Sequence, residues 1–160
     1  MQQRLTKEQA WQKLKHYCAY QERSHSEVKT KLYGFKLYKS EVEELLSKAI
    51  EEDYLNEERF AELFAGGKFR MKSWGKVKIL YELRQKGVSS YNINRGLKAI
   101  PDADYKSTLQ KLATNKWNSL EGEHPLSRHA KTISYLQQKG YELPLIQQAI
   151  QSIKKGETAD

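Results

Sequence analysis

The sequence predicts an all-α fold of three tandem three-helix repeats that form an elongated, curved molecule. Apolar residues recur at the spacing of a helical face in nearly every segment, and no segment alternates apolar and polar residues for long enough to predict a strand. A short motif with a glycine also recurs at a constant interval. The composition, with 30% charged and 38% hydrophobic residues, suits thin helical units with much surface rather than one thick core.

Capping signals mark where the first helices begin. Ser24 is followed three residues later by Glu27, and Ser40 by Glu43, as in a capping box. Asn56 precedes a pair of glutamates, which favours a helix start because negative charge stabilises a helix N-terminus. The apolar faces that follow such signals are Val42, Leu45, Leu46, Ala49 and Ile50; Ile93, Leu97 and Ile100; and Ile146, Ala149, Ile150 and Ile153.

Prolines and a serine mark boundaries later in the chain. Pro101 is expected to end the helix that closes at Ile100, and Ser127 is expected to cap the segment after Pro125. Pro144 suits the first turn of the last helix, because its fixed φ is helical and its missing N–H has no partner there.

Three glycines define the repeat. Gly34, Gly87 and Gly140 are spaced by 53 residues, each after an apolar residue two to four positions earlier and before another amphipathic segment. Gly87 and Gly140 each follow a lysine at the end of a segment with helical apolar periodicity. Helices commonly end with a residue in the left-handed conformation at this position, and glycine adopts it most easily. We therefore predict repeats over residues 5–53, 54–100 and 102–154, followed by a flexible tail over 155–160.

The overall charge points to an anionic partner. The net charge is +8 and the isoelectric point about 9.4, as in proteins that meet nucleic acid, a membrane surface or an acidic protein face. The apolar runs are too short for a membrane span. Cys18 is the only cysteine, so an internal disulfide is excluded and a reducing cytoplasm is the expected location.

No set of residues predicts catalysis, a metal site or a cofactor site. The four histidines are scattered, and Cys18 is two residues from His16, a spacing at which helical side chains do not face each other. Gly66 and Gly67 lie inside a helical pattern rather than in a phosphate-binding loop. We therefore expect a protein that is not an enzyme and that uses no cofactor.

Charge is segregated in the middle of the chain. Residues 41–58 contain eight acidic side chains and one lysine, whereas residues 68–86 contain seven basic side chains and one acid. Basic residues beside an aromatic ring suit contact with phosphates and bases. As a hypothesis, the surface that binds a partner or DNA consists of Lys68, Arg70, Lys72, Trp74, Lys76, Lys78, Arg84 and Lys86. A tryptophan at a helix start is more often a residue that packs between helices than one that stacks on a base, so Trp74 is also expected to support its helix by packing.

The ordered motifs of the chain resemble those of the RecX family. DYLNEERFAELF (residues 53–64) followed by KSWGKVKILYELRQKGVSS (72–90) is similar to the family pattern GYLDDERFA, KGxGPxxI and ELxxKGI. RSHSEVKTKL (23–32) and ISYLQQKGYELPLIQQAI (133–150) resemble its first and third units. Ser73 replaces a family glycine and Lys76 a family proline, which weakens the fixed entry to the helix but adds a positive charge.

The resemblance implies a non-enzymatic regulator of DNA repair, recombination and the SOS response. RecX-like proteins are tandem three-helix repeats that lie in the groove of the RecA filament on DNA. They inhibit its ATPase, its strand exchange and its promotion of repressor cleavage. The implied partners are the RecA filament and the DNA within it, with weak non-specific binding to free DNA. We expect a monomer that does not contact a membrane.

Two other functions are compatible with the residues. Three-helix units with a basic helix also describe tandem helix-turn-helix modules, which would bind naked duplex with sequence preference. A structural adaptor that joins two proteins would instead bind its partner equally well without DNA.

Overall fold

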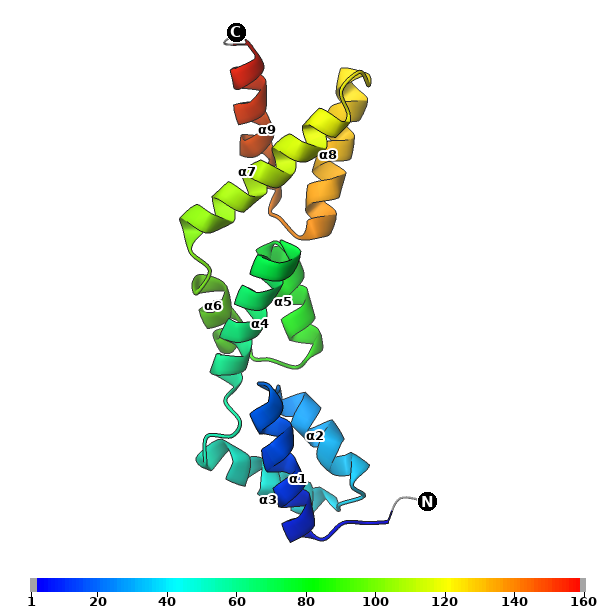
Figure 1. The fold of residues 1–160 in the computed structure, drawn as a ribbon, viewed down its shortest axis with the longest axis vertical. Helices are drawn as coiled ribbons and strands as arrows, with labels where there is room; N and C mark the ends of the chain where they lie inside the picture. The colour runs from blue at the N-terminus through cyan, green and yellow to red at the C-terminus, as the bar shows by residue number, and fades with distance from the viewer. Residues whose placement is uncertain (1–2, 159–160) are drawn as a thin grey trace. The chain divides into compact units, whose positions relative to one another are not determined.

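The computed structural model describes residues 3–158, which form nine α-helices and no strand (Figure 1). The prediction of an all-α fold is therefore confirmed. The helices are α1 (Lys7–Tyr20), α2 (His25–Gly34), α3 (Lys39–Glu51), α4 (Glu57–Lys72), α5 (Lys76–Gln85), α6 (Ser90–Lys98), α7 (Asp102–Ser119), α8 (Pro125–Lys139) and α9 (Leu143–Thr158). They follow one another in the chain as three sets of three, and the repeat boundaries themselves stay a prediction.

Two of the predicted caps are confirmed. The Ser24 hydroxyl accepts a hydrogen bond from the backbone N–H of Glu27 at 3.1 Å, and Asn56 Oδ1 accepts one from the N–H of Arg59 at 2.9 Å. Each satisfies an N–H group that the helix itself leaves without a partner. The proline prediction for α9 is also confirmed, because Pro144 is the second residue of that helix.

The capping box predicted at Ser40 is wrong. Helix α3 begins earlier, at Lys39, so Ser40 already lies within its first turn. The residue before the helix is Tyr38, whose backbone N–H donates to the Glu41 carboxylate at 2.9 Å. A glutamate reaching back to the cap residue stabilises the helix start in the same way as the second half of a capping box.

The cap predicted at Ser127 is also wrong. Helix α8 begins at Pro125, and the cap is His124, whose Nδ1 accepts a hydrogen bond from the N–H of Leu126 at 3.2 Å. The proline fixes a helical φ at the first position, which allows the helix to begin two residues before the serine.

The three repeat glycines are not structurally equivalent. Gly87 and Gly140 have φ of 76° and 101°, as predicted for left-handed residues that end a helix. Gly34 is instead the last residue of α2 and has no positive φ. The left-handed residue that follows α2 is Lys36, with φ 63°. Four residues separate Gly34 from α3, whereas two separate Gly87 from α6 and two separate Gly140 from α9, so the turn of the first repeat lies beyond the glycine.

The chain divides into two compact units. The first contains the residues up to Phe64 together with Leu83–Gly96, and the second contains Ala65–Glu82 together with the residues from Leu97 onwards. In the first unit, helices α1, α2 and α3 pack pairwise on one another. Their shared core is made of Ala10, Trp11, Leu14, Cys18, Val28, Leu32, Leu37, Val42, Leu45, Ala49 and Leu55. Ile50, predicted on this apolar face, is 44% exposed.

In the second unit, helices α7, α8 and α9 pack pairwise on one another. Helix α7 is buried along a stripe at four-residue spacing, formed by Tyr105, Leu109, Ala113 and Trp117. Four-residue spacing keeps these side chains on one helical face. The predicted apolar face of α9 is buried at Ile146, Ala149 and Ile150.

Helix α9 continues beyond the residue at which the sequence predicts a tail. It extends to Thr158, and residues 159–160 of the predicted tail lie outside the described residues. The last turns are tied to α7, because the indole N–H of Trp117 donates to the Glu157 carboxylate at 2.9 Å. The Lys154 ammonium also lies 5.6 Å from the centre of the Trp117 ring.

Candidate partner and nucleic-acid interface

Trp74 is the centre of a cationic site in the second unit. It lies in the loop between α4 and α5, and its ring is partly buried. The ammonium group of Lys68 lies 5.1 Å from the ring centre and that of Lys78 lies 4.5 Å from it. One aromatic ring thus holds a cation from the end of α4 and another from the start of α5. Such contacts stabilise the position of an ammonium group and leave its charge in place.

The loop that carries Trp74 is held by hydrogen bonds of the Ser73 N–H and carbonyl groups. The N–H of Ser73 donates to the carbonyl of Phe69 at 3.0 Å, which extends the hydrogen-bond pattern of α4 by one residue. The carbonyl of Ser73 accepts a hydrogen bond from the Tyr141 hydroxyl at 2.9 Å. Ser73 has φ 56°, a left-handed conformation that costs a residue with a side chain about 1 kcal/mol or more. This is the position at which the RecX pattern has glycine.

Lys76, the first residue of α5, is bound to Tyr105 in two ways. Its backbone N–H donates to the Tyr105 hydroxyl at 2.9 Å, and its ammonium group lies 4.8 Å from the centre of that ring. The family proline at this position would have no N–H to donate. The Tyr105 hydroxyl in turn donates to the Glu142 carboxylate. Burial, with this hydrogen bond, raises the pKa of Tyr105 far above its usual range.

Arg70 and Lys72 lie in the last turn of α4 and are exposed. Cations at this end of a helix are favoured by the helix dipole. The Lys72 carbonyl accepts a hydrogen bond from the Lys139 ammonium at 3.4 Å. Lys139 is a further cation of this site that the sequence did not predict, because it lies 67 residues away in the chain.

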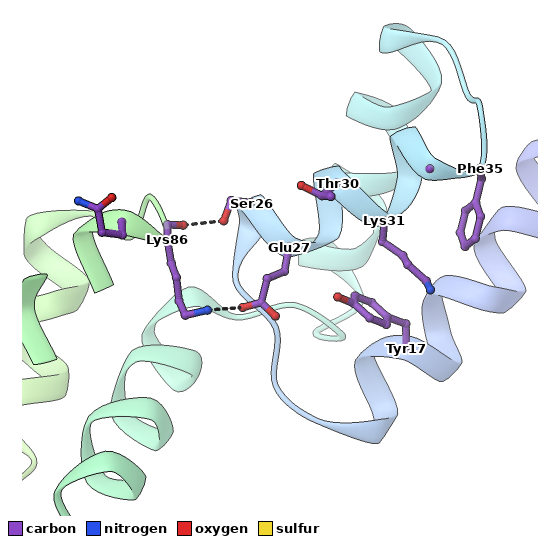
Figure 2. Close-up of a pocket in the computed structure, with 9 residues that line it drawn as sticks. Tyr17, Ser26, Glu27, Thr30, Lys31, Phe35 and Lys86 are labelled. Carbon is purple, nitrogen blue, oxygen red and sulfur yellow. Dashed lines mark hydrogen bonds and ion pairs between the residues drawn. The ribbon is translucent and has the colours of Figure 1, made fainter. Parts of the chain in front are cut away.

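The last two predicted residues, Arg84 and Lys86, belong to the first unit. Arg84 is exposed, whereas Lys86 is tied to α2. The Lys86 ammonium forms an ion pair with Glu27 at 3.6 Å, and its carbonyl accepts a hydrogen bond from the Ser26 hydroxyl at 2.6 Å (Figure 2). Lys86 therefore neutralises a local carboxylate in addition to contributing to a basic surface. The six predicted residues from Lys68 to Lys78 all lie in the second unit.

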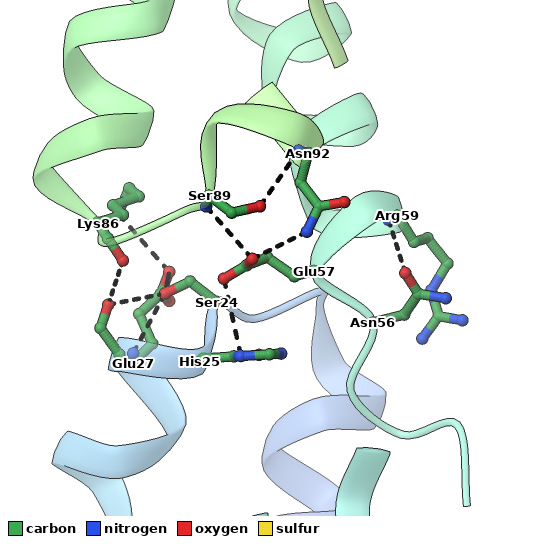
Figure 3. A network of polar contacts seen from close by, with 10 residues as sticks. Ser24, His25, Glu27, Asn56, Glu57, Arg59, Lys86, Ser89 and Asn92 are labelled. Atoms are coloured by element: carbon green, nitrogen blue, oxygen red, sulfur yellow. Dashed lines mark hydrogen bonds and ion pairs between the residues drawn. The ribbon is translucent and has the colours of Figure 1, made fainter. Parts of the chain in front are cut away.

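A polar network holds the starts of α2, α4 and α6 together within the first unit (Figure 3). Glu57 accepts hydrogen bonds from the N–H of Ser89 at 3.4 Å and from the side-chain amide of Asn92 at 2.9 Å. His25 Nδ1 lies 3.7 Å from its other oxygen. The Glu57 side chain is only 11% exposed, so this acid serves the fold rather than a solvated acidic face.

Sequence reasoning missed a second basic surface, on α1 and α2. Lys13, His16, Tyr17 and Tyr20 lie at the spacing of one helical face. These four residues line a cavity together with residues at the two ends of α2. The face was missed because it carries no apolar pattern. The alternation of basic and aromatic residues at helical spacing was the signal that could have revealed it.

The structure reveals no metal-binding cluster or membrane helix in the part of the chain that it describes. Among residues 3–158, no three His, Cys, Asp or Glu side chains are grouped so that they could hold a metal ion. No helix in the same range is long and apolar enough to cross a membrane. Cys18 is buried in the core of the first unit, where burial raises the pKa of its thiol.

Solved structures of RecX proteins share this fold. The crystal structure of RecX from Lactobacillus salivarius has a TM-score of 0.86, with 22% sequence identity over 92% of this chain and 96% of that one. A second structure, described as regulatory protein RecX, has a TM-score of 0.82 and 21% identity, and covers 91% of this chain and 71% of that chain. At these identities the likeness shows the fold.

Sequence comparisons identify the same family. The regulatory protein RecX of Chlorobium phaeobacteroides is 32% identical over 136 residues, which is 82% of this chain and 86% of that protein. The regulatory protein RecX of Oceanobacillus iheyensis is 26% identical over 160 residues, and this chain spans 59% of its length. The family model of the second three-helix domain of RecX matches residues 56–97, and that of the third matches residues 103–150. The chain therefore belongs to the RecX family of regulatory proteins.

Proposed function

We propose that this chain is a non-enzymatic modulator of the RecA recombinase. It binds the groove of the RecA–DNA filament and suppresses ATP hydrolysis, strand exchange and coprotease activity. Family membership supports the regulatory role, and the cationic site around Trp74 supports contact with a partner that carries negative charge. The proposed partners are the filament and its DNA, with weak non-specific binding to free DNA. The chain acts as a monomer in the cytoplasm.

The observation that carries the proposal is the arrangement of cations around Trp74. Lys76 and Lys78 lie over aromatic rings, and within residues 3–158 neither forms an ion pair with a carboxylate. Their charges are therefore available to phosphates or to acidic side chains of a partner. A lysine whose ammonium group is already held over a ring also loses less side-chain entropy when it binds.

The proposed mechanism is mechanical. A protein that binds adjacent protomers of a filament favours the relative arrangement that it contacts. ATP turnover and filament growth require the protomers to change that arrangement. Inhibition then follows because this chain binds one state of the filament more tightly than the other. No catalysis by this chain is needed.

The test is ATP hydrolysis by the cognate RecA on single-stranded DNA, with this protein added at substoichiometric levels. DNA is kept in excess, so that competition for DNA does not imitate inhibition. We expect the wild-type chain to lower the turnover rate markedly. We expect a Lys76→Glu, Lys78→Glu double variant to lose most of this effect. It should fold, because both positions lie in the first turn of α5, where negative charge is favoured.

A charge-matched control distinguishes the effect of the Trp74 site from the effect of a lower net charge. Lys29 and Lys111 are exposed residues of α2 and α7, outside the proposed site. The Lys29→Glu, Lys111→Glu variant has the same net charge as the test variant and should inhibit like the wild type. Equal inhibition by the wild type and the test variant would refute the role of the Trp74 site. Absence of inhibition together with sequence-dependent binding to naked duplex would instead indicate a helix-turn-helix protein.

A further inference from the structure

The basic surface of the first unit is a groove between α1 and the two ends of α2. We name it the α1–α2 groove and define it by six of the residues that line it, Lys13, Tyr17, Tyr20, Arg23, Lys31 and Phe35. Its volume is about 430 Å³. Tyr17, Lys31 and Phe35 also line a neighbouring cavity of about 480 Å³ that reaches Lys86 (Figure 2). The two cavities therefore form a continuous surface from Lys13 to Lys86 within the first unit.

The cations of the groove are held in place by aromatic rings. The Arg23 guanidinium lies 3.7 Å from the centre of the Tyr17 ring, and its Nε donates to the Tyr17 carbonyl at 3.0 Å. The Lys31 ammonium lies 5.1 Å from the same ring centre and 5.7 Å from that of Phe35. Only one of the guanidinium nitrogens is used by the carbonyl, so the others remain able to donate to a ligand.

Among residues 3–158, no carboxylate lines the α1–α2 groove. The two acids nearest in sequence are each paired with another cation. Glu22 forms an ion pair with Arg59, and Glu27, which lines the neighbouring cavity, forms one with Lys86 at 3.6 Å. Lys13, Arg23 and Lys31 therefore give the groove a net positive charge that the fold does not neutralise. Charge complementarity requires an anionic occupant.

Tyr20 indicates which kind of anion fits. Its ring centre lies 5.9 Å from the Arg23 guanidinium, yet its side chain is 83% exposed at the end of α1, so the ring is open to a ligand beside that cation. An exposed aromatic ring beside cations is the arrangement with which proteins stack successive bases while they contact the phosphates of a single strand. An acidic peptide would use the charges but would have no need of the ring.

We propose that the α1–α2 groove binds single-stranded nucleic acid. Arg23, Lys31 and Lys13 contact the phosphates, and a base stacks on Tyr20. This site lies on α1 and α2, apart from the site around Trp74 in the sequence, and its binding of a strand does not depend on RecA.

The test measures binding of a fluorescein-labelled oligothymidylate of about 16 nucleotides to the full chain by anisotropy. All variants are made in the Lys76→Glu, Lys78→Glu background, so that binding near Trp74 does not mask the result. Tyr20→Ala should weaken binding about tenfold, the change expected for the loss of one stacked base. Lys13→Glu, Lys31→Glu should weaken it by more than that. The slope of log K against log salt, which is negative, should become less negative by about 1.4.

The controls match each change. Tyr91 is 65% exposed on α6, and the guanidinium of Arg95 lies 5.3 Å from its ring centre, so Tyr91→Ala should leave binding unchanged. Lys29→Glu, Lys111→Glu should have at most a small, non-specific effect. Loss of affinity that is equal for Tyr20→Ala and Tyr91→Ala would overturn the proposal. So would tighter binding of polyglutamate than of the oligothymidylate, which would assign the groove to an acidic protein.

A second readout locates the contact directly. An oligonucleotide that carries 5-iododeoxyuridine crosslinks under ultraviolet light to aromatic side chains that stack on it. Peptide mapping should find the crosslink at Tyr20. A crosslink confined to Trp74 in the wild-type chain would overturn the proposal. Failure of RecA inhibition with retained crosslinking at Tyr20 would reject the proposed function and leave this site intact.

Discussion

The backbone of Gly75 lies directly against that of Gly140. A side-chain carbon on Gly75 would lie 2.3 Å from the carbonyl oxygen of Gly140. The N–H of Gly75 donates to the carbonyl of Lys139 at 2.8 Å, and the N–H of Val77 donates to that of Gly140 at the same distance. The loop that carries Trp74 is therefore joined, backbone to backbone, to the turn between α8 and α9.

The first prediction concerns this contact. Gly75→Ala would place a methyl group in steric overlap with backbone atoms of Gly140, whose carbonyl is held by the hydrogen bond from Val77. We expect it to lower the free energy of unfolding by about 3 kcal/mol, the upper range for overpacking. Urea unfolding followed by circular dichroism measures this change. Gly67→Ala is the matched control: no atom lies within 4 Å of a new carbon there, and it should stabilise α4 by about 0.5–1 kcal/mol. Equal effects of the two substitutions would contradict the close approach.

The second prediction separates two glycines that look equivalent in the repeat. Gly87 has φ 76° and Gly34 has no positive φ, and neither has an atom within 4 Å of a new carbon. Only backbone conformation therefore distinguishes them. Gly87→Ala should cost about 1 kcal/mol of unfolding free energy, whereas Gly34→Ala should be neutral or slightly stabilising. Urea unfolding measures both free energies. If the two glycines were structurally equivalent, the two substitutions would lower the free energy of unfolding by equal amounts, which would contradict this prediction.

The third prediction uses the departure of Ser73 from the RecX pattern. Ser73→Gly removes the cost of a left-handed serine and retains the hydrogen bonds of its N–H and carbonyl. We expect a net gain of about 0.5–1 kcal/mol in the free energy of unfolding. This is less than the full cost of the left-handed serine, because glycine has greater freedom in the unfolded chain. Ser73→Ala keeps the left-handed backbone and should give no gain. A gain from alanine as large as that from glycine would show that the backbone conformation is not the cause.

The fourth prediction is a loss of stability at alkaline pH. Burial raises the pKa of both Tyr105 and Tyr141 above the usual value of about 10. Above that pH the unfolded chain loses these protons while the folded chain keeps them. The folded state is thus favoured fully below about pH 10, and its stability falls as the pH rises further. The expected slope is about 1.4 kcal/mol per pH unit for each tyrosine.

The slope can be assigned by substitution. Tyr105→Phe removes one of the two groups that ionise only in the unfolded chain, and Tyr141→Phe removes the other. In each variant the free energy of unfolding should fall less steeply with pH, by the contribution of one tyrosine. The slope is obtained from the free energy of unfolding measured at several pH values between about 9 and 11. Tyr105→Phe should also lower stability at neutral pH, because the N–H of Lys76 and the carboxylate of Glu142 lose their partner. An unchanged slope in both variants would show that other groups cause the alkaline loss.

The sequence predicted what depends on neighbours in the chain. The helices, the caps at Ser24 and Asn56 and the left-handed Gly87 and Gly140 all follow from patterns that span a few residues. The cap at Ser40 was wrong for the same reason, since Glu41 competes from one residue away. The order of the motifs was enough to indicate the RecX family.

Only the tertiary structure decided which groups the basic residues contact. The bond between the Tyr141 hydroxyl and the Ser73 carbonyl joins residues 68 positions apart, and no periodicity reports on such a distance. The same is true of Lys86, which the sequence placed in a basic cluster and which the structure pairs with Glu27. A charge pattern shows which side chains are cationic, but packing determines which carboxylates are near enough to neutralise them. For that reason the sequence by itself determined the helices and the family, and the fold determined the loop that holds Trp74 and the groove beside Tyr20.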